Sequence, residues 1–276
     1  MLNGLDLFSG IGGITLGLQQ WVKPICYCEN EPYAQSVIKS RIEDGSLPAA
    51  PIWDDVRTLD GRPFEGLVDV IYGGFPCQDI SVAGNGEGLE GKRSGLFFEI
   101  MRLAEEIKPS FIFLENVPAI RTRGLSTVCE ELSSLRYDCR YGVISAHSVG
   151  APHKRERWFM LAYSNSNKLR KKQIKELRCI NKTEFGDNGQ KKPLANPLRE
   201  GLERWEKPKA AWKAFAEYGC DGASRGISGI PKPAICRNDD GIRNRAHRIK
   251  CLGNAVVPAQ VQEAFKRLIG LNNGAF

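Results

Sequence analysis

The stretch LNGLDLFSGIGG, residues 2–13, decides how the rest of the chain is interpreted. Its apolar residues predict a buried strand at 2–8, and Gly10, Gly12 and Gly13 form a turn before a helix-like segment at 14–21. Glycines at such a turn let the backbone bend tightly and approach a ligand. Thr15 stands where the dinucleotide fingerprint G-x-G-x-x-G needs its third glycine, so the loop indicates only a generic nucleotide-type site.

The alternation of buried strands and helices continues to Tyr163. Strands are expected at 2–8, 24–28, 68–75, 110–117, 139–146 and 157–163, and helices at 14–21, 32–41, 95–107 and 125–135. This repetition predicts an α/β fold with a Rossmann-like, doubly wound, mostly parallel sheet, whose ligands bind at the carboxyl ends of the strands. After Tyr163 the pattern stops until 248–270, where a turn leads into an amphipathic helix beginning near Pro258.

Composition excludes several classes of protein. The chain has 276 residues, of which 42% are hydrophobic and 26% charged, so it is neither globally disordered nor collagen-like. It has no apolar run of about 18 residues and no signal-peptide pattern, which predicts a soluble, cytoplasmic protein without membrane contact. Nine cysteines without a CxxC and three histidines without ligand spacing argue against a metal site.

The positive charge is concentrated in one segment. Residues 164–213 hold fourteen Lys or Arg against six Asp or Glu, an excess of +8, whereas the whole chain carries +7. The segment also lacks apolar periodicity. It is therefore either a solvated insertion or a nucleic-acid contact, because clustered cations bind phosphates with release of counterions.

Acidic residues follow the predicted strand at 24–28 and a further short strand expected directly before Asp54. Glu29, in CYCENEP, stands where a carboxylate accepts hydrogen bonds from ribose hydroxyls. Asp54 and Asp55, in IWDDV, are candidates for an adenine amine. A single carboxylate of this kind is commonly a helix cap, and it is their order along the chain that favours a nucleotide site.

The loop VDVIYGGFPCQDIS, residues 68–81, carries a candidate nucleophile. Cys77 follows a buried strand and is framed by Gly73, Gly74 and Pro76, where backbone N–H groups can stabilise a thiolate. The next apolar run, FIFLENVPAI, delivers Glu115. Partial burial raises the pKa of such a carboxyl group, which suits it to hold or donate a proton.

Five motifs, in their order along the chain from Leu5 to about Val261, closely resemble those of the C5-cytosine DNA methyltransferases. They are FSGIGG, PCQ, ENV, a downstream RxR in PHKRERW and a late GNAVVP. The resemblance implies transfer of a methyl group from S-adenosyl-L-methionine to C5 of a cytosine flipped out of double-stranded DNA. It implies that Cys77 adds to C6, that Glu115 meets the charge at N3, and that an arginine of the pair Arg155 and Arg157 holds O2. The acceptor of the C5 proton is not identified.

The resemblance also implies cofactor and DNA contacts. The cofactor residues by motif match are Phe8, Gly10, Glu29, Asp55, Pro76, Gly12, Asn254 and Val256. The glycine-rich segment 81–95 is expected to close over the target, with Ser81, Lys92, Arg93 and Arg155 at the DNA. Three parts are expected: a catalytic domain at 1–163, a small basic target-recognition domain at 164–248, and a segment at 249–276 that returns to the catalytic domain.

Two features depart from the family pattern. His153 replaces the usual glutamine before the RxR, and the recognition region is short, so the target sequence is not readable. The compact chain resembles stand-alone bacterial or phage enzymes, expected as monomers, which either accompany a restriction endonuclease or act alone.

Three rival functions agree less well with the sequence. An RNA methyltransferase of the same family is disfavoured because its Cys-Phe-Thr tripeptide is missing from the sequence. A silent DNA-binding relative is disfavoured by the intact Cys77, Glu115, Arg155 and Arg157. A nicotinamide oxidoreductase is disfavoured by the broken glycine fingerprint and by the PCQ loop, which hydride transfer does not need.

Overall fold

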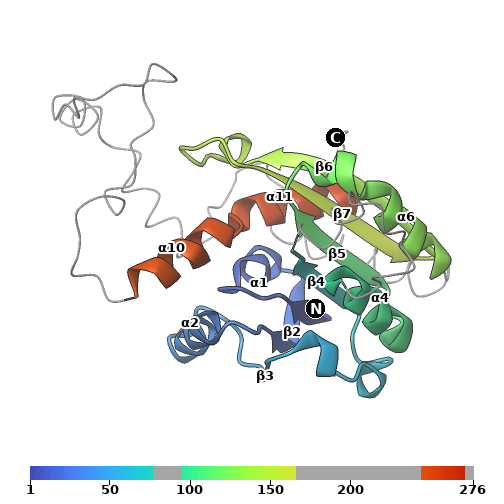
Figure 1. The fold of residues 1–276 in the computed structure, drawn as a ribbon, viewed down its shortest axis with the longest axis horizontal. Helices are drawn as coiled ribbons and strands as arrows, with labels where there is room; N and C mark the ends of the chain where they lie inside the picture. Colours follow the sequence, from blue (N-terminus) through green and yellow to red (C-terminus); the bar gives the residue numbers. More distant parts are fainter. Residues whose placement is uncertain (77–94, 166–243, 271–276) are drawn as a thin grey trace, which may run out of the picture. The chain divides into compact units, whose positions relative to one another are not determined.

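A seven-stranded sheet organises the part of the chain that the computed structural model describes, namely residues 1–76, 95–165 and 244–270 (Figure 1). Its strand order is β3-β2-β1-β4-β5-β7-β6. The first five strands in this order are parallel, and β7 runs antiparallel to both β5 and β6. The strands are β1 Leu2–Leu7, β2 Val22–Cys28, β3 Ile52–Trp53, β4 Val70–Gly74, β5 Phe111–Asn116, β6 Tyr137–Ser145 and β7 Glu156–Ser164.

Five of the seven helices in the described residues agree with predicted segments, and the two at 120–123 and 245–254 were not predicted. The helices are α1 Gly13–Leu18, α2 Pro32–Glu43, α4 Leu96–Ile107, α5 Ile120–Arg123, α6 Leu125–Ser134, α10 Arg245–Asn254 and α11 Pro258–Leu268, with short 3₁₀ turns η1 Val56–Thr58, η2 Arg62–Phe64 and η4 His147–Val149. The predicted α/β fold with a mostly parallel sheet is confirmed.

The prediction of a turn before Pro258 is wrong in part, because the helix α10 extends over Arg245–Asn254. No residue of α10 is buried, so its sequence lacks the apolar periodicity that reveals a helix. Arg, Ala, Lys and Leu, which dominate it, are nevertheless good helix formers.

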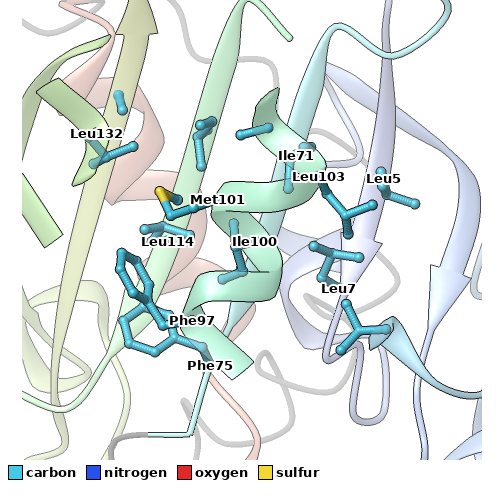
Figure 2. Close-up of a cluster of buried hydrophobic side chains, with 14 of the residues drawn as sticks. Leu5, Leu7, Ile71, Phe75, Phe97, Ile100, Met101, Leu103, Leu114 and Leu132 are labelled. Atoms are coloured by element: carbon cyan, nitrogen blue, oxygen red, sulfur yellow. The ribbon is translucent and has the colours of Figure 1, made fainter. Parts of the chain in front are cut away.

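Alternation along the strands buries side chains on both faces of the sheet. On one face, α4 covers the sheet, and Figure 2 shows its side chains among those of the strands. The labelled members of this cluster are Leu5, Leu7, Ile71, Phe75, Phe97, Ile100, Met101, Leu103, Leu114 and Leu132. The opposite face buries another cluster, which includes Val70, Tyr72, Phe111 and Phe113.

The C-terminal helix α11 completes the second face by packing against α1 (Figure 1). The ring of Phe265 lies 5.2 Å from that of Trp21 and 5.6 Å from that of Phe113. Gly17 permits this contact, because a Cβ there would lie 2.4 Å from Cβ of Val261. The return of the chain to its first loop is therefore observed. Most of the predicted recognition domain, 164–248, lies outside the described residues, so the division into three parts stays a prediction.

Candidate active site

A cavity of about 820 Å³ lies where the carboxyl ends of the parallel strands meet the returning segment. The predicted residues that line it are Phe8, Gly10, Glu29, Asp55, Pro76, Glu115, Arg157, Asn254 and Val256. Gly12 and Arg155 do not line it. Cys77, Ser81, Lys92 and Arg93 lie outside the described residues.

The loop after β1 owes its shape to residues in the left-handed region. Phe8, Gly10 and Gly12 have φ values of 54°, 55° and 80°. A Cβ at Gly12 would lie 2.5 Å from a methyl group of Leu47, so only glycine fits there for reasons of both conformation and space. Gly12 shapes the loop from behind, while Gly10 faces the cavity.

Glu29, at the end of β2, ties this loop to the second strand. Its carboxylate accepts the N–H of Gly10 at 2.7 Å and the N–H of Glu31 at 2.8 Å. Burial raises its pKa, and these backbone hydrogen bonds oppose the rise. A carboxylate has about four acceptor positions, so two such bonds leave capacity for a ligand hydroxyl.

The other predicted cofactor acid, Asp55, already has a strong partner. Its carboxylate accepts the backbone N–H of Arg57 at 3.0 Å as the cap of η1, and it pairs with the Arg57 guanidinium at 2.8 Å. Arg57 thereby holds the pKa of Asp55 below its usual range. Asp54, its neighbour, also lines the cavity.

On the opposite side of the cavity, Glu115 at the end of β5 pairs with Arg157 at 2.8 Å, and both side chains are less than 15% exposed. Glu115 aligns with Phe159 of the antiparallel strand β7, so Arg157, two residues away, presents its side chain on the same face. Burial raises the pKa of Glu115 to about 7, against the lowering effects of Arg157 and Arg155. The site thus holds a desolvated acid beside a fixed cation.

Two further residues set the position of this acid. A Cβ at Gly74 would lie 2.5 Å from Oε2 of Glu115, so the glycine leaves room for the carboxyl group. The side-chain amide of Asn116 donates to the carbonyl of Phe75 at 3.0 Å and fixes the chain beside Pro76, the residue before Cys77. The nucleophile loop therefore starts at the cavity wall.

Arg155 points elsewhere. Its Nη2 donates to the carbonyl oxygens of Gly253 at 2.6 Å and Ala255 at 2.7 Å, in the returning segment. The sequence predicts the same kind of role for both arginines of the RxR, and only the tertiary structure separates them, because Arg157 lies on β7 and Arg155 precedes it.

The returning helix α10 contributes cavity residues that the sequence analysis missed, among them Lys250 and Cys251. Nζ of Lys250 lies 2.8 Å from the Glu31 carboxylate, and the His247 ring stacks on Tyr33 at 5.3 Å. No sequence signal marked Lys250, because it belongs to the segment expected to be a turn.

Within the described residues, no three His, Cys, Asp or Glu side chains are grouped as metal ligands. In the same ranges, no helix is both long enough and apolar enough to cross a membrane.

The sheet, with its antiparallel seventh strand and a nucleotide-sized cavity at the carboxyl ends, has the S-adenosylmethionine-dependent methyltransferase fold. The family model for C-5 cytosine-specific DNA methylase matches residues 2–216, and the chain belongs to this family. The resemblance stated from the sequence is confirmed.

Relatives and a solved structure agree with this assignment. The chain is 37% identical over 159 residues to the type II methyltransferase M.CviJI of Paramecium bursaria Chlorella virus IL3A, covering 57% of this chain and 42% of that protein. It is 33% identical over 170 residues to the type II methyltransferase M.HhaI of Haemophilus parahaemolyticus, covering 59% and 50%. A DNMT2 mutant of Spodoptera frugiperda shares the fold, with a TM-score of 0.50 at 19% identity over 61% of this chain and 51% of that one. The chain spans about half the length of these relatives.

Proposed function

We propose that the protein is a DNA (cytosine-5)-methyltransferase that acts on a cytosine flipped out of duplex DNA. The observation that carries this proposal is the buried Glu115–Arg157 pair on the wall of the cavity that Glu29 and Gly10 line from the other side. A desolvated acid with a pKa of about 7 can deliver a proton or hydrogen bond to N3 of the base, and Arg157 can hold O2.

S-adenosyl-L-methionine fits the cavity in size and chemistry. The volume of the cavity, about 820 Å³, is within the range of small-molecule sites. The Glu29 carboxylate keeps acceptor capacity for ribose hydroxyls. We assign the cofactor contacts to Phe8, Gly10, Glu29, Asp55, Pro76, Asn254 and Val256, with Gly12 supporting the loop. When bound, the cofactor supplies an electrophilic methyl group.

The chain's own residues prepare the base for this methyl group. The Cys77 thiolate adds to C6 of cytosine, and protonation or hydrogen bonding at N3 by Glu115 makes C5 nucleophilic. After C5 has been methylated, loss of its proton and of the thiol restores the aromatic ring. Cys77 follows Pro76, which lines the cavity, and this supports its place in the step.

Double-stranded DNA is the proposed partner. The region 164–248 is assigned to target recognition, since its excess of +8 over 164–213 suits phosphate contact, and 249–276 to the return. Ser81, Lys92 and Arg93 are assigned to the DNA in a segment that closes over the flipped base. Because the curated relatives named above are type II enzymes of a virus and a bacterium, we propose a monomer that works in the cytoplasm, with a restriction endonuclease as a possible companion.

The test is covalent trapping. Duplex DNA with 5-fluorocytosine at each cytosine, incubated with the protein and S-adenosylmethionine, is expected to give a denaturation-resistant adduct that maps to Cys77. Cys77→Ser should give none. Bisulfite sequencing of DNA from expressing cells should show 5-methylcytosine at a defined site. Trapping on an RNA transcript and not on DNA would assign the RNA activity instead, and no adduct on either would refute the proposal.

A further inference from the structure

One residue, Arg155, holds the returning segment by both its side chain and its main chain. Its Nη2 donates to the carbonyls of Gly253 and Ala255 at 2.6 and 2.7 Å. Its own carbonyl accepts the side-chain amide of Gln260 at 2.7 Å, and the same amide donates to Ile144 at 2.8 Å. Gln260 is fully buried in α11, so this anchor is a fixed part of the core.

The carbonyls that Arg155 binds flank Asn254, a cavity residue, and the carbonyl of Ala255 directly precedes Val256, another cavity residue. Val256 in turn lies against the first turn of α1, where a Cβ at Gly13 would be 3.1 Å from its carbonyl oxygen. A shift of this backbone would therefore move the cavity wall and the residue that packs behind the first loop.

An arginine suits this position for two reasons. Gly253 and Ala255 lie at the carboxyl end of α10, where carbonyls lack intrahelical partners and the helix dipole favours a cation. Both hydrogens of one Nη2 are used by these carbonyls, which directs the guanidinium toward the returning segment while Arg157 takes the Glu115 carboxylate.

We propose that Arg155 is a positioning residue of the cofactor cavity, which caps α10 and fixes the 253–256 backbone so that Asn254 and Val256 can contact the cofactor. The identity of the ligand rests on the function proposed above. Within the RxR, Arg157 then serves the base and Arg155 serves the cofactor wall.

Arg155→Met tests this tether, with Arg140→Met as the matched control, since Arg140 is exposed on β6. Without any ligand, amide hydrogen exchange at 250–257 is expected to be at least about tenfold faster in Arg155→Met and unchanged in Arg140→Met. Calorimetric titration with S-adenosylhomocysteine is expected to show about 10- to 100-fold weaker binding in Arg155→Met, from two lost charge-assisted hydrogen bonds.

Kinetics separate a positioning role from a general loss of structure. KM for S-adenosylmethionine should rise in Arg155→Met while kcat at saturating cofactor stays within about threefold, and Arg155→Lys should recover part of the affinity because an ammonium can still donate. If Arg155→Met does not fold, Arg155→Lys is read alone, with an intermediate exchange rate and affinity expected.

Each outcome decides the matter. Normal exchange and normal cofactor affinity in Arg155→Met, with weaker and less salt-dependent DNA binding, would overturn the inference in favour of a phosphate contact. Failure of the unaltered protein to bind S-adenosylhomocysteine would overturn the proposed function and this inference together. A cofactor-binding protein without methylation of any DNA would overturn the function alone.

Discussion

The two sides of the cavity present different chemical groups. Toward β1 and β2, the groups offered are backbone amides and Glu29, whose carboxylate is held by two N–H donors. Toward β5 and β7, they are two charged side chains, Glu115 and Arg157, buried against each other. The first arrangement suits a ligand that must bind and leave, and the second suits a proton that must move in a low dielectric.

The largest effects are expected when the same carboxyl-to-amide change is made on each side of the cavity, at Glu115 and at Glu29. Glu115→Gln removes the proton donor, so methylation is expected to slow by a factor on the order of 10²–10⁴ with DNA affinity retained. Single-turnover methylation and DNA-binding titrations measure the two quantities. An unchanged rate would refute the role of Glu115.

Glu29→Gln is the matched comparison for this variant. Its new NH₂ group would oppose the amide of Gly10 or of Glu31, which lie 2.7 and 2.8 Å from the carboxylate. Cofactor affinity should therefore fall, whereas the rate at saturating cofactor should recover. A Glu29→Gln protein with normal affinity and a slow chemical step would contradict the division between the two sides.

The sequence predicted the strands, the sheet class and the acids because alternation and strand ends are local signals. Glu115 was recognisable as a carboxylate that emerges from an apolar run, and the low exposure of its side chain in the structure has the same cause. The pairing of Arg157 with Glu115 was not predictable, because it depends on the register of two antiparallel strands 40 residues apart in the chain.

The contributions of α10 were missed for a different reason. Its helix buries no residue, and Lys250 reaches the cavity only through tertiary contacts of the returning segment. Asp55 was predicted as a cofactor residue, but the sequence could not reveal that its carboxylate pairs with Arg57, two residues later.

The stability of the protein should depend on pH through the buried carboxyl group of Glu115. The pKa of Glu115 is about 7 when folded and near 4.5 when unfolded, so the folded protein binds more protons between these values. The stability of the unaltered protein relative to Glu115→Gln should then fall as the pH rises from about 4.5 to 7, by up to about 3 kcal/mol. Denaturant unfolding of both proteins at pH 5 and pH 8 measures the difference, and a gap that does not change with pH would contradict the raised pKa.

A buried polar network behind the cofactor loop should have the next largest effect. The Thr15 hydroxyl donates to the Asp6 carboxyl group at 2.6 Å and lies 2.9 Å from the Tyr72 hydroxyl, and all three side chains are almost fully buried. Burial raises the pKa of Asp6 to about 8, so its carboxyl group is mostly protonated at neutral pH. Hydrogen bonds, and not a charge pair, therefore hold the network together. Thr15→Val leaves two buried groups without this partner and should cost about 1–3 kcal/mol of unfolding free energy.

Thr15→Ser is the control for this network, because it keeps the hydroxyl and loses one methyl group. Its expected cost is about 1 kcal/mol, measured by the same denaturant unfolding. Equal losses in Thr15→Val and Thr15→Ser would show that packing, and not hydrogen bonding, stabilises the region behind the loop.

The smallest effect is expected at the mouth of the cavity, where Lys250 pairs with Glu31 at 2.8 Å in an exposed position. Lys250→Met should weaken S-adenosylhomocysteine binding by no more than about fivefold, since exposed ion pairs are weak and screened by salt. Lys108→Met is the control, because Lys108 pairs with Glu65 at 2.8 Å in a similarly exposed site. Neither Lys108 nor Glu65 lines the cavity. Raising the salt concentration should bring the affinity of the unaltered protein toward that of Lys250→Met. A loss of 100-fold that persists at high salt would instead mean that Lys250 binds the cofactor directly, and the cofactor side would then depend on a cation, as the opposite side does on Arg157.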